Sequence, residues 1–163
     1  FLPDVVWKGI KQSYGALNIM TLGSGNAYIE NKLKEYAYTY TNFALDLGYK
    51  EYLSHKIYAS ADFLLMPSRV EPCGLNQMYS MRYGTVPVVR YTGGLRDTVE
   101  DISTGGAGLN FTYPGVDDIV HAMNRALGIY NQKGIMEDLI HANMKFDFAW
   151  EKSAEKYIAL YNN

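Results

Sequence analysis

The segment from Met66 to Gln77 (MPSRVEPCGLNQ) holds the residues best suited to chemistry in this sequence. It follows an apolar run, passes through a polar turn that contains a glycine, and enters a helical pattern. The backbone N–H groups of residues 74–77 would then point out of a helix N-terminus, where an anion such as a phosphate can bind. Glu71 lies just ahead of this turn and is the only carboxylate of the segment.

Two interpretations of Glu71 stay open on physical grounds. Its carboxylate can simply complement the dipole of the following helix, or it can act on a ligand held at the turn. The nearby acids Asp97, Glu100 and Asp101 have the pattern of a solvated helix face, so they suggest no partner carboxylate. Cys73 has no histidine near it in the segment, and we interpret it as a small buried hydrophobic residue rather than a nucleophile.

Other segments of the sequence give weaker evidence for a functional site. The two glycines of Thr92 to Leu95 (TGGL) indicate a positive φ angle or a close backbone approach, made either for a tight turn or for a ligand. An exposed ring at Tyr49 could stack on a base. The GSG at residues 23–25 begins a dinucleotide-binding pattern, but Tyr28 replaces its third glycine, so NAD binding is not expected. The histidines have no partners at metal-ligand spacing, and no metal site is predicted.

Apolar runs of strand length alternate with helical patterns along the chain. This alternation predicts an α/β, Rossmann-like domain with a mostly parallel sheet and helices on both faces. Ligands of such sheets bind beyond the carboxyl ends of the strands, which points to the loops described above. We expect strands at 16–25, 41–49, 62–68, 86–93 and 106–112, and helices from Pro3, at 26–38 with Asn26 as cap, at 50–61, 75–84 and 95–101, and in three further segments after residue 115.

The composition narrows the possible classes of protein. With 163 residues, of which 48% are hydrophobic, the chain is expected to form one domain spanning residues 1–163. A net charge of −2 argues against nucleic acid as a partner. A single cysteine fits a reducing compartment, and no apolar run is long enough for a membrane span, so we expect a cytoplasmic protein. The chain opens at Phe1 inside a helical pattern, which indicates an excerpt of a longer protein.

The motifs of this sequence, taken together, resemble the glycogen and starch synthase family. The matching positions run almost without interruption from Met66 to Val99 and recur before and after that stretch. They are Met66–Arg69, Glu71–Leu75, Gln77, Arg82–Arg90, Thr92–Leu95 and Asp97–Val99, with Gly48–Tyr49 and Ser54–His55 upstream and Phe148–Trp150, Ser153, Ala154 and Tyr157 downstream.

The resemblance implies a GT-B glycosyltransferase, in which two Rossmann-like domains face each other across a cleft and this chain is the C-terminal, nucleotide-sugar-binding one. It implies transfer of glucose from ADP-glucose or UDP-glucose to the non-reducing end of an α-1,4-glucan with retained anomeric configuration, and no cofactor or metal. By the same resemblance Glu71 is the catalytic candidate. The substrate-binding candidates are Tyr49 beside the base, Leu75 and Asn76 at the diphosphate, and Cys73, Gly74, Thr92, Gly93 and Gly94.

The sequence departs from the family pattern in one respect. The family's domain begins with a strand that ends in an arginine and a lysine for the phosphates, and this chain begins after it. The neighbours of that strand would then lack a partner. Since the acceptor glucan belongs to the N-terminal domain, we expect the chain to be inactive alone.

Two alternatives remain at this point. One is the donor-binding domain of another GT-B glycosyltransferase or of a nucleotide-sugar epimerase, and the other is a non-catalytic nucleotide-binding module. The sequence does not distinguish adenine from uracil in the donor.

Overall fold

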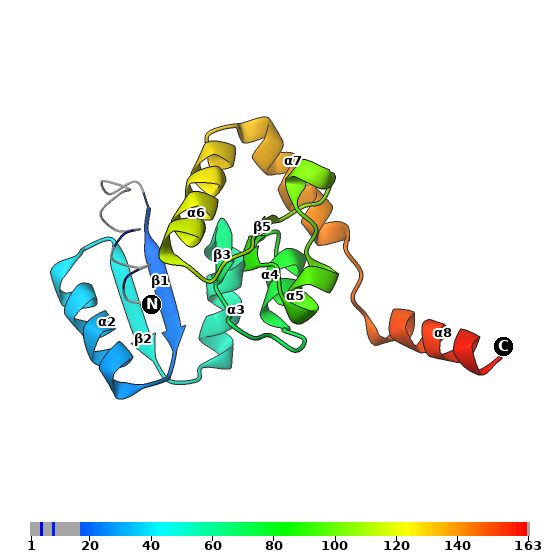
Figure 1. Ribbon diagram of the computed structural model, residues 1–163, viewed down its shortest axis with the longest axis horizontal. Helices are drawn as coiled ribbons and strands as arrows, with labels where there is room; N and C mark the ends of the chain where they lie inside the picture. Colours follow the sequence, from blue (N-terminus) through cyan, green and yellow to red (C-terminus); the bar gives the residue numbers. More distant parts are fainter. Residues whose placement is uncertain (1–3, 5–7, 9–16, 163) are drawn as a thin grey trace.

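The computed structural model describes residues 4, 8 and 17–162, and the helix expected from Pro3 onward lies largely outside that part. Strands alternate with helices along the described chain (Figure 1). The elements are β1 (Ile19–Gly23), α2 (Ala27–Thr39), β2 (Phe43–Leu47), α3 (Glu51–Ser60), β3 (Phe63–Met66), α4 (Asn76–Arg82), β4 (Val86–Arg90), α5 (Gly93–Thr98), the 3-10 turn η1 (Ile102–Thr104), β5 (Leu109–Phe111), α6 (Val116–Tyr130), α7 (Lys133–Lys145) and α8 (Trp150–Tyr161).

The strands pair in parallel, as the alternating pattern predicts, but they divide between two sheets. β1 pairs with β2, while β3, β4 and β5 form a second sheet in that order. Among the described residues, β1 and β3 are therefore edge strands of different sheets rather than neighbours in one.

The second sheet carries helices on both faces because alternate residues of a strand point to opposite sides. Val88 of β4 packs with β5, α6 and α7. Its neighbour Val89 packs in another cluster with side chains of β3, α4 and α5. Both valines are almost fully buried. Figure 1 shows α6 and α7 on one side of these strands and α4 and α5 on the other.

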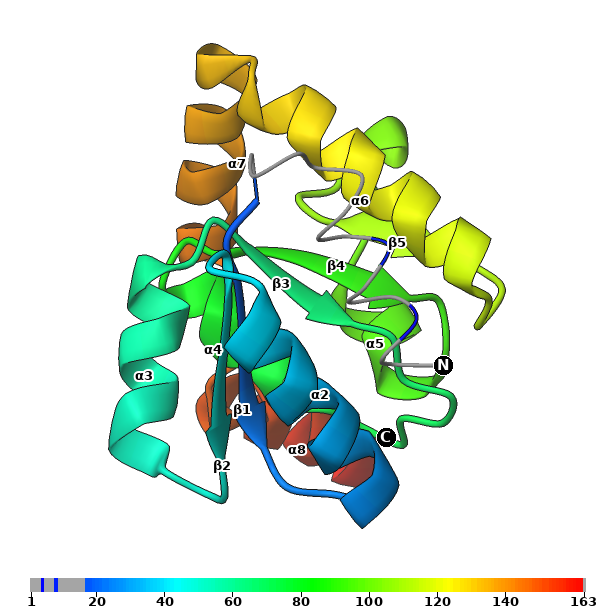
Figure 2. The same ribbon diagram turned by 90° about the vertical axis from the view of Figure 1, so that its left-hand side faces the viewer.

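The first sheet has a smaller core of its own. Leu33 of α2 and Phe43 of β2 are its buried residues, and α2 lies along the two strands (Figure 2). As predicted, Asn26 caps α2: its side-chain oxygen accepts a hydrogen bond of 2.8 Å from the N–H group of Tyr28. This bond fixes where the chain turns from β1 into the helix.

The last helix differs from the others because α8 buries none of its residues. Trp150, Ile158 and Leu160 are exposed along it, and the helix lies apart from the rest of the chain at its carboxyl end (Figure 1). In the part of the chain that the structure describes, no helix has the length and apolar character needed to cross a bilayer.

The strands β3 and β4 are shorter than the apolar runs of the sequence predicted. The run expected to continue to Ser68 leaves the sheet after Met66, and the run expected to reach Gly93 leaves it after Arg90. In the second case the N–H group of Thr92 bonds back to the Arg90 carbonyl, so the chain turns instead of extending. The loops at the carboxyl ends of β3 and β4 are correspondingly longer.

Asp101 is a structural residue and not part of a solvated helix face, so that interpretation is wrong for this one of the three acids. Its carboxylate accepts hydrogen bonds from Arg125 at 2.7 Å and from the N–H groups of Ser103 at 2.9 Å and Asn110 at 2.6 Å. Burial alone would raise the pKa of Asp101, but these bonds outweigh it and lower the pKa to about 2. The ionised carboxylate therefore ties η1, β5 and α6 together.

Asp101→Asn should destabilise the fold at neutral pH by about 2 kcal/mol. Because the pKa of Asp101 is lower in the folded state than its usual value near 3.8, its stabilisation is complete above that value and disappears as the pH falls toward 2. Chemical denaturation at several pH values should show the wild-type advantage shrinking over this window. Asp97→Asn, at an exposed position, is the control and should show no such trend; a pH-independent difference for Asp101→Asn would contradict the account.

Candidate functional site

The loop from Pro67 to Leu75 connects β3 to α4 and contains the candidate catalytic residue Glu71. The loop has no helix or strand of its own, so its shape depends on contacts with neighbouring segments. The Glu71 side chain is half-buried, and the Ser68 hydroxyl donates to one of its carboxylate oxygens at 3.3 Å. The carboxylate is thus oriented from within its own loop.

The loop after β4 lies directly against the Glu71 loop. The N–H group of Gly94 donates to the Glu71 carbonyl at 3.1 Å. A β-carbon on Gly93 would lie 1.9 Å from the Glu71 carbonyl oxygen, and one on Gly94 would lie 2.1 Å from that of Cys73. Gly93 also has a φ of +46°, which favours glycine. The glycine pair predicted to permit a close backbone approach therefore permits contact between these two loops.

Gln77 holds the other half of the loop, a role that the sequence did not reveal. Its side chain is fully buried, and its amide nitrogen donates to the carbonyls of Gly74 at 2.9 Å and Cys73 at 3.3 Å. The same nitrogen donates to the Thr98 hydroxyl of α5 at 3.0 Å. The sequence offers two hints: Gln77 matches the family pattern, and it is a polar residue on the first turn of a helix, where a buried amide needs partners.

Cys73 is exposed, so the expectation that it is a buried hydrophobic residue is wrong. The loop lies on the surface, and the thiol faces the carbonyl of Gly74 at 3.5 Å instead of the core. Leu75 and Asn76 are exposed as well, and no side chain caps the N-terminus of α4. Since α4 has only seven residues, an anion here would be held by individual N–H groups more than by a helix dipole.

Tyr49 follows β2 and is 86% exposed, so its ring is accessible for stacking. It lies in the loop after a strand of the other sheet. Glu71, Cys73, Gly74, Gly93 and Gly94, in contrast, form one contiguous group at the carboxyl ends of β3 and β4. Thr92 joins that group at the start of α5. The structure therefore brings most of the predicted site residues together, with the tyrosine on a separate element.

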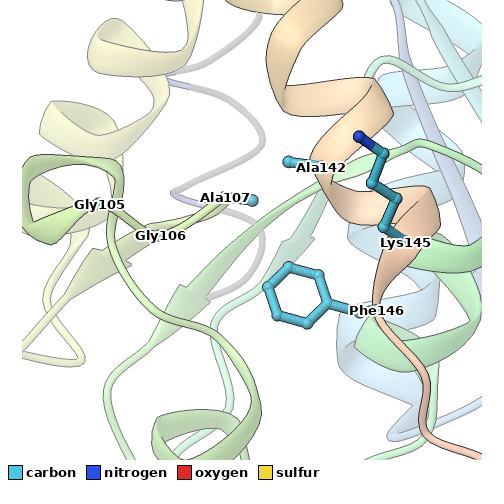
Figure 3. A pocket seen from close by; sticks show the side chains of 6 residues that line it. All are labelled: Gly105, Gly106, Ala107, Ala142, Lys145 and Phe146. Atoms are coloured by element: carbon cyan, nitrogen blue, oxygen red, sulfur yellow. The ribbon is translucent and has the colours of Figure 1, made fainter.

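A shallow pocket of about 280 Å³ lies elsewhere, between the turn before β5 and the end of α7 (Figure 3). Gly105, Gly106 and Ala107 line one side of it, and Ala142, Lys145 and Phe146 line the other. None of these is a predicted site residue, and the turn precedes its strand instead of following it. In the described part of the chain, no group of three or more histidine, cysteine or acidic residues could hold a metal ion.

Comparison with known proteins adds to this geometry. The family model described as "Glycosyl transferases group 1" matches residues 1–128, which is most of the chain. The chain belongs to this family. The matched region ends within α6, so it contains both loops of the candidate site.

Curated relatives of this glycosyltransferase chain are named glycogen synthase. The one from Flavobacterium johnsoniae is 46% identical over 99% of this chain, which spans 34% of that protein. The one from Thermodesulfovibrio yellowstonii is 48% identical over 98% of this chain and 30% of that protein. A solved structure, the catalytic domain of starch synthase IV from Arabidopsis thaliana bound to ADP and acarbose, has a TM-score of 0.82 and 32% identity over 98% of this chain and 36% of its own. The chain thus spans about a third of these relatives.

Gly94→Ala should displace the Glu71 loop, because the new methyl group meets the fixed backbone of Cys73. We expect a loss of about 2–3 kcal/mol in the free energy of unfolding, typical of forced overpacking. Gly128→Ala is the matched control: it lies within α6 with open space around it, and alanine there should be neutral or stabilising by up to about 1 kcal/mol. Equal effects of the two substitutions in denaturant titrations would show that the loops are not in contact.

Proposed function

We propose that this chain is the nucleotide-sugar-binding part of a glycogen or starch synthase. The protein would transfer glucose from ADP-glucose or UDP-glucose to the non-reducing end of an α-1,4-glucan with retention. The observation that carries the proposal is the pairing of the Glu71 loop with Gly93 and Gly94 at the carboxyl ends of adjacent parallel strands. Relatives named glycogen synthase that match almost the whole chain support the same assignment.

The chemistry follows from where charge develops in such a reaction. As the glycosidic bond of the donor breaks, negative charge grows on the nucleoside diphosphate. N–H groups at Leu75 and Asn76 that already point toward it would stabilise the transition state more than the ground state. Glu71, across the loop, would face the transferred glucose. The reaction as proposed needs no metal and no cofactor.

The donor would extend from this site toward Tyr49, whose exposed ring offers a stacking surface for the base. The starch synthase IV catalytic domain was solved bound to ADP and acarbose, which supports a nucleoside diphosphate as part of the donor. A tyrosine ring can stack on adenine or on uracil. The choice between ADP-glucose and UDP-glucose is therefore left to direct measurement.

Residues 1–163 would be the C-terminal domain of a two-domain, cytoplasmic enzyme. Two features support this organisation. The chain spans about a third of the length of its glycogen synthase relatives. In addition, among the described residues β1 and β3 each lie at the edge of a separate sheet, where a further strand could pair with them. The glucan acceptor would bind mainly to the other domain.

Glu71→Gln in the intact protein should lower kcat by about a hundredfold or more, because a neutral amide cannot provide the negative charge that faces the sugar. The melting temperature should change little, since the Glu71 side chain is half-buried and bonded only to Ser68 among the described residues. The assay is primer-dependent glucose incorporation from each nucleotide sugar.

Glu137→Gln, an exposed carboxylate on α7, is the matched control and should leave the rate unchanged. The isolated 163-residue chain, which we expect to be inactive, serves as the negative control. An unchanged kcat for Glu71→Gln with a large loss of stability would instead support a helix-dipole role for Glu71. Donor binding without any transfer by the intact wild-type protein would favour a non-catalytic nucleotide-binding module.

A further inference from the structure

The guanidinium group of Arg90 connects the carboxyl ends of three neighbouring strands. Arg90 is the last residue of β4. Its Nε donates to the carbonyl of Thr112, directly after β5, at 3.0 Å. Its Nη1 donates to the carbonyls of Ser68, at 3.3 Å, and Arg69, both just after β3. One side chain therefore binds the loops on both sides of its own strand.

These bonds reach Glu71 through a single residue. Ser68 accepts a hydrogen bond from Arg90 through its backbone carbonyl, and its hydroxyl donates to the Glu71 carboxylate at 3.3 Å. Displacing the Ser68 backbone would displace the hydroxyl that orients the carboxylate. Arg90 does not itself bond to Glu71 in the described contacts, so its influence would pass through the loop.

The bonds suit an arginine in particular. Within the part of the chain that the structure describes, no ion pair includes Arg90, and its partners are neutral carbonyl oxygens. A guanidinium presents five N–H donors in a planar fork and can serve carbonyls on two sides at once, whereas a lysine ammonium is a compact charge on a flexible stem. Arg90 therefore acts by donating correctly directed hydrogen bonds to three carbonyls, and not by neutralising the charge of a carboxylate.

Arg90 and the glycine pair hold different parts of the loop. Gly94 bonds to the backbone of Glu71, and Gln77 bonds to the carbonyls of Cys73 and Gly74, so these contacts fix the second half. The first half, at Ser68 and Arg69, is held across the strand ends by Arg90. Without the guanidinium, the first half would lose these bonds while the second half kept its own.

We propose that Arg90 is a positioning residue that sets the orientation of the Glu71 carboxylate through the Ser68–Arg69 backbone. The proposal rests on the proposed function, since it assigns Arg90 a part in the chemistry at Glu71. It predicts an effect on the chemical step rather than on acceptor binding. A displacement of a catalytic group by about 1 Å can cost a hundredfold in rate without unfolding a protein.

The test compares Arg90→Gln, Arg90→Lys and Arg82→Gln in the intact protein. Arg82 is the matched control. Its Nη1 also donates to a backbone carbonyl of another element, that of Met144 in α7, at 3.2 Å. Arg82 is the last residue of α4, so it lies at the end of that helix opposite the loop. Arg90→Gln should lower kcat by about tenfold to a hundredfold with the KM for the glucan acceptor unchanged. Arg90→Lys should recover part of the loss, and Arg82→Gln should match the wild type in kcat.

Hydrogen exchange on the same intact proteins provides a readout that does not depend on activity. Peptides covering residues 67–78 should exchange faster in Arg90→Gln than in the wild type, whereas Arg82→Gln should leave them unchanged. If the wild-type protein transfers no glucose, the proposed function fails, and exchange alone still decides whether Arg90 holds the loop. Should Arg90→Gln fail to fold, Arg90→Lys takes its place in both measurements. Wild-type kcat and wild-type exchange in the Arg90 variants, or equal losses in Arg82→Gln, would overturn the proposal.

Discussion

The site depends on one backbone contact, the hydrogen bond from the N–H group of Gly94 to the carbonyl of Glu71. β3 and β4 are parallel neighbours, so their carboxyl ends bring the two loops to the same edge of the sheet. Only residues without a β-carbon allow the loops to meet as closely as they do at Gly93 and Gly94. With the Glu71 backbone fixed by this contact, its carboxylate can be oriented from Ser68 and the start of α4 can remain exposed to a ligand.

Most of the fold could be predicted from patterns that are local in sequence. The alternation of apolar runs and helical periods predicts parallel strands, and an asparagine before a helical pattern predicts the cap at Asn26. The glycine pair predicts a close approach, although the sequence does not say to what. The division into two sheets could not be deduced from periodicity, because a buried strand has the same pattern whichever neighbour it pairs with.

The sequence-based interpretations of Cys73 and Asp101 were wrong, and the roles of Arg90 and Gln77 were not predicted. All of these depend on tertiary contacts. Whether Cys73 is buried depends on how far its loop stands from the core, and whether Asp101 is solvated depends on an arginine more than twenty residues away. The roles of Arg90 and Gln77 depend on backbone carbonyls as partners. Every residue has such a carbonyl, so the sequence carries no signal that marks the ones a side chain will bind. The family resemblance marks both positions without giving the reason.

The most direct test of the account is a structure of the intact protein with a nucleoside diphosphate bound, obtained separately with ADP and UDP. The diphosphate should lie within hydrogen-bond distance of the N–H groups of Leu75 and Asn76, beside the paired loops that carry Glu71 and Gly94. A diphosphate bound at the amino ends of the strands, for example in the pocket lined by Gly105 and Lys145, would contradict it.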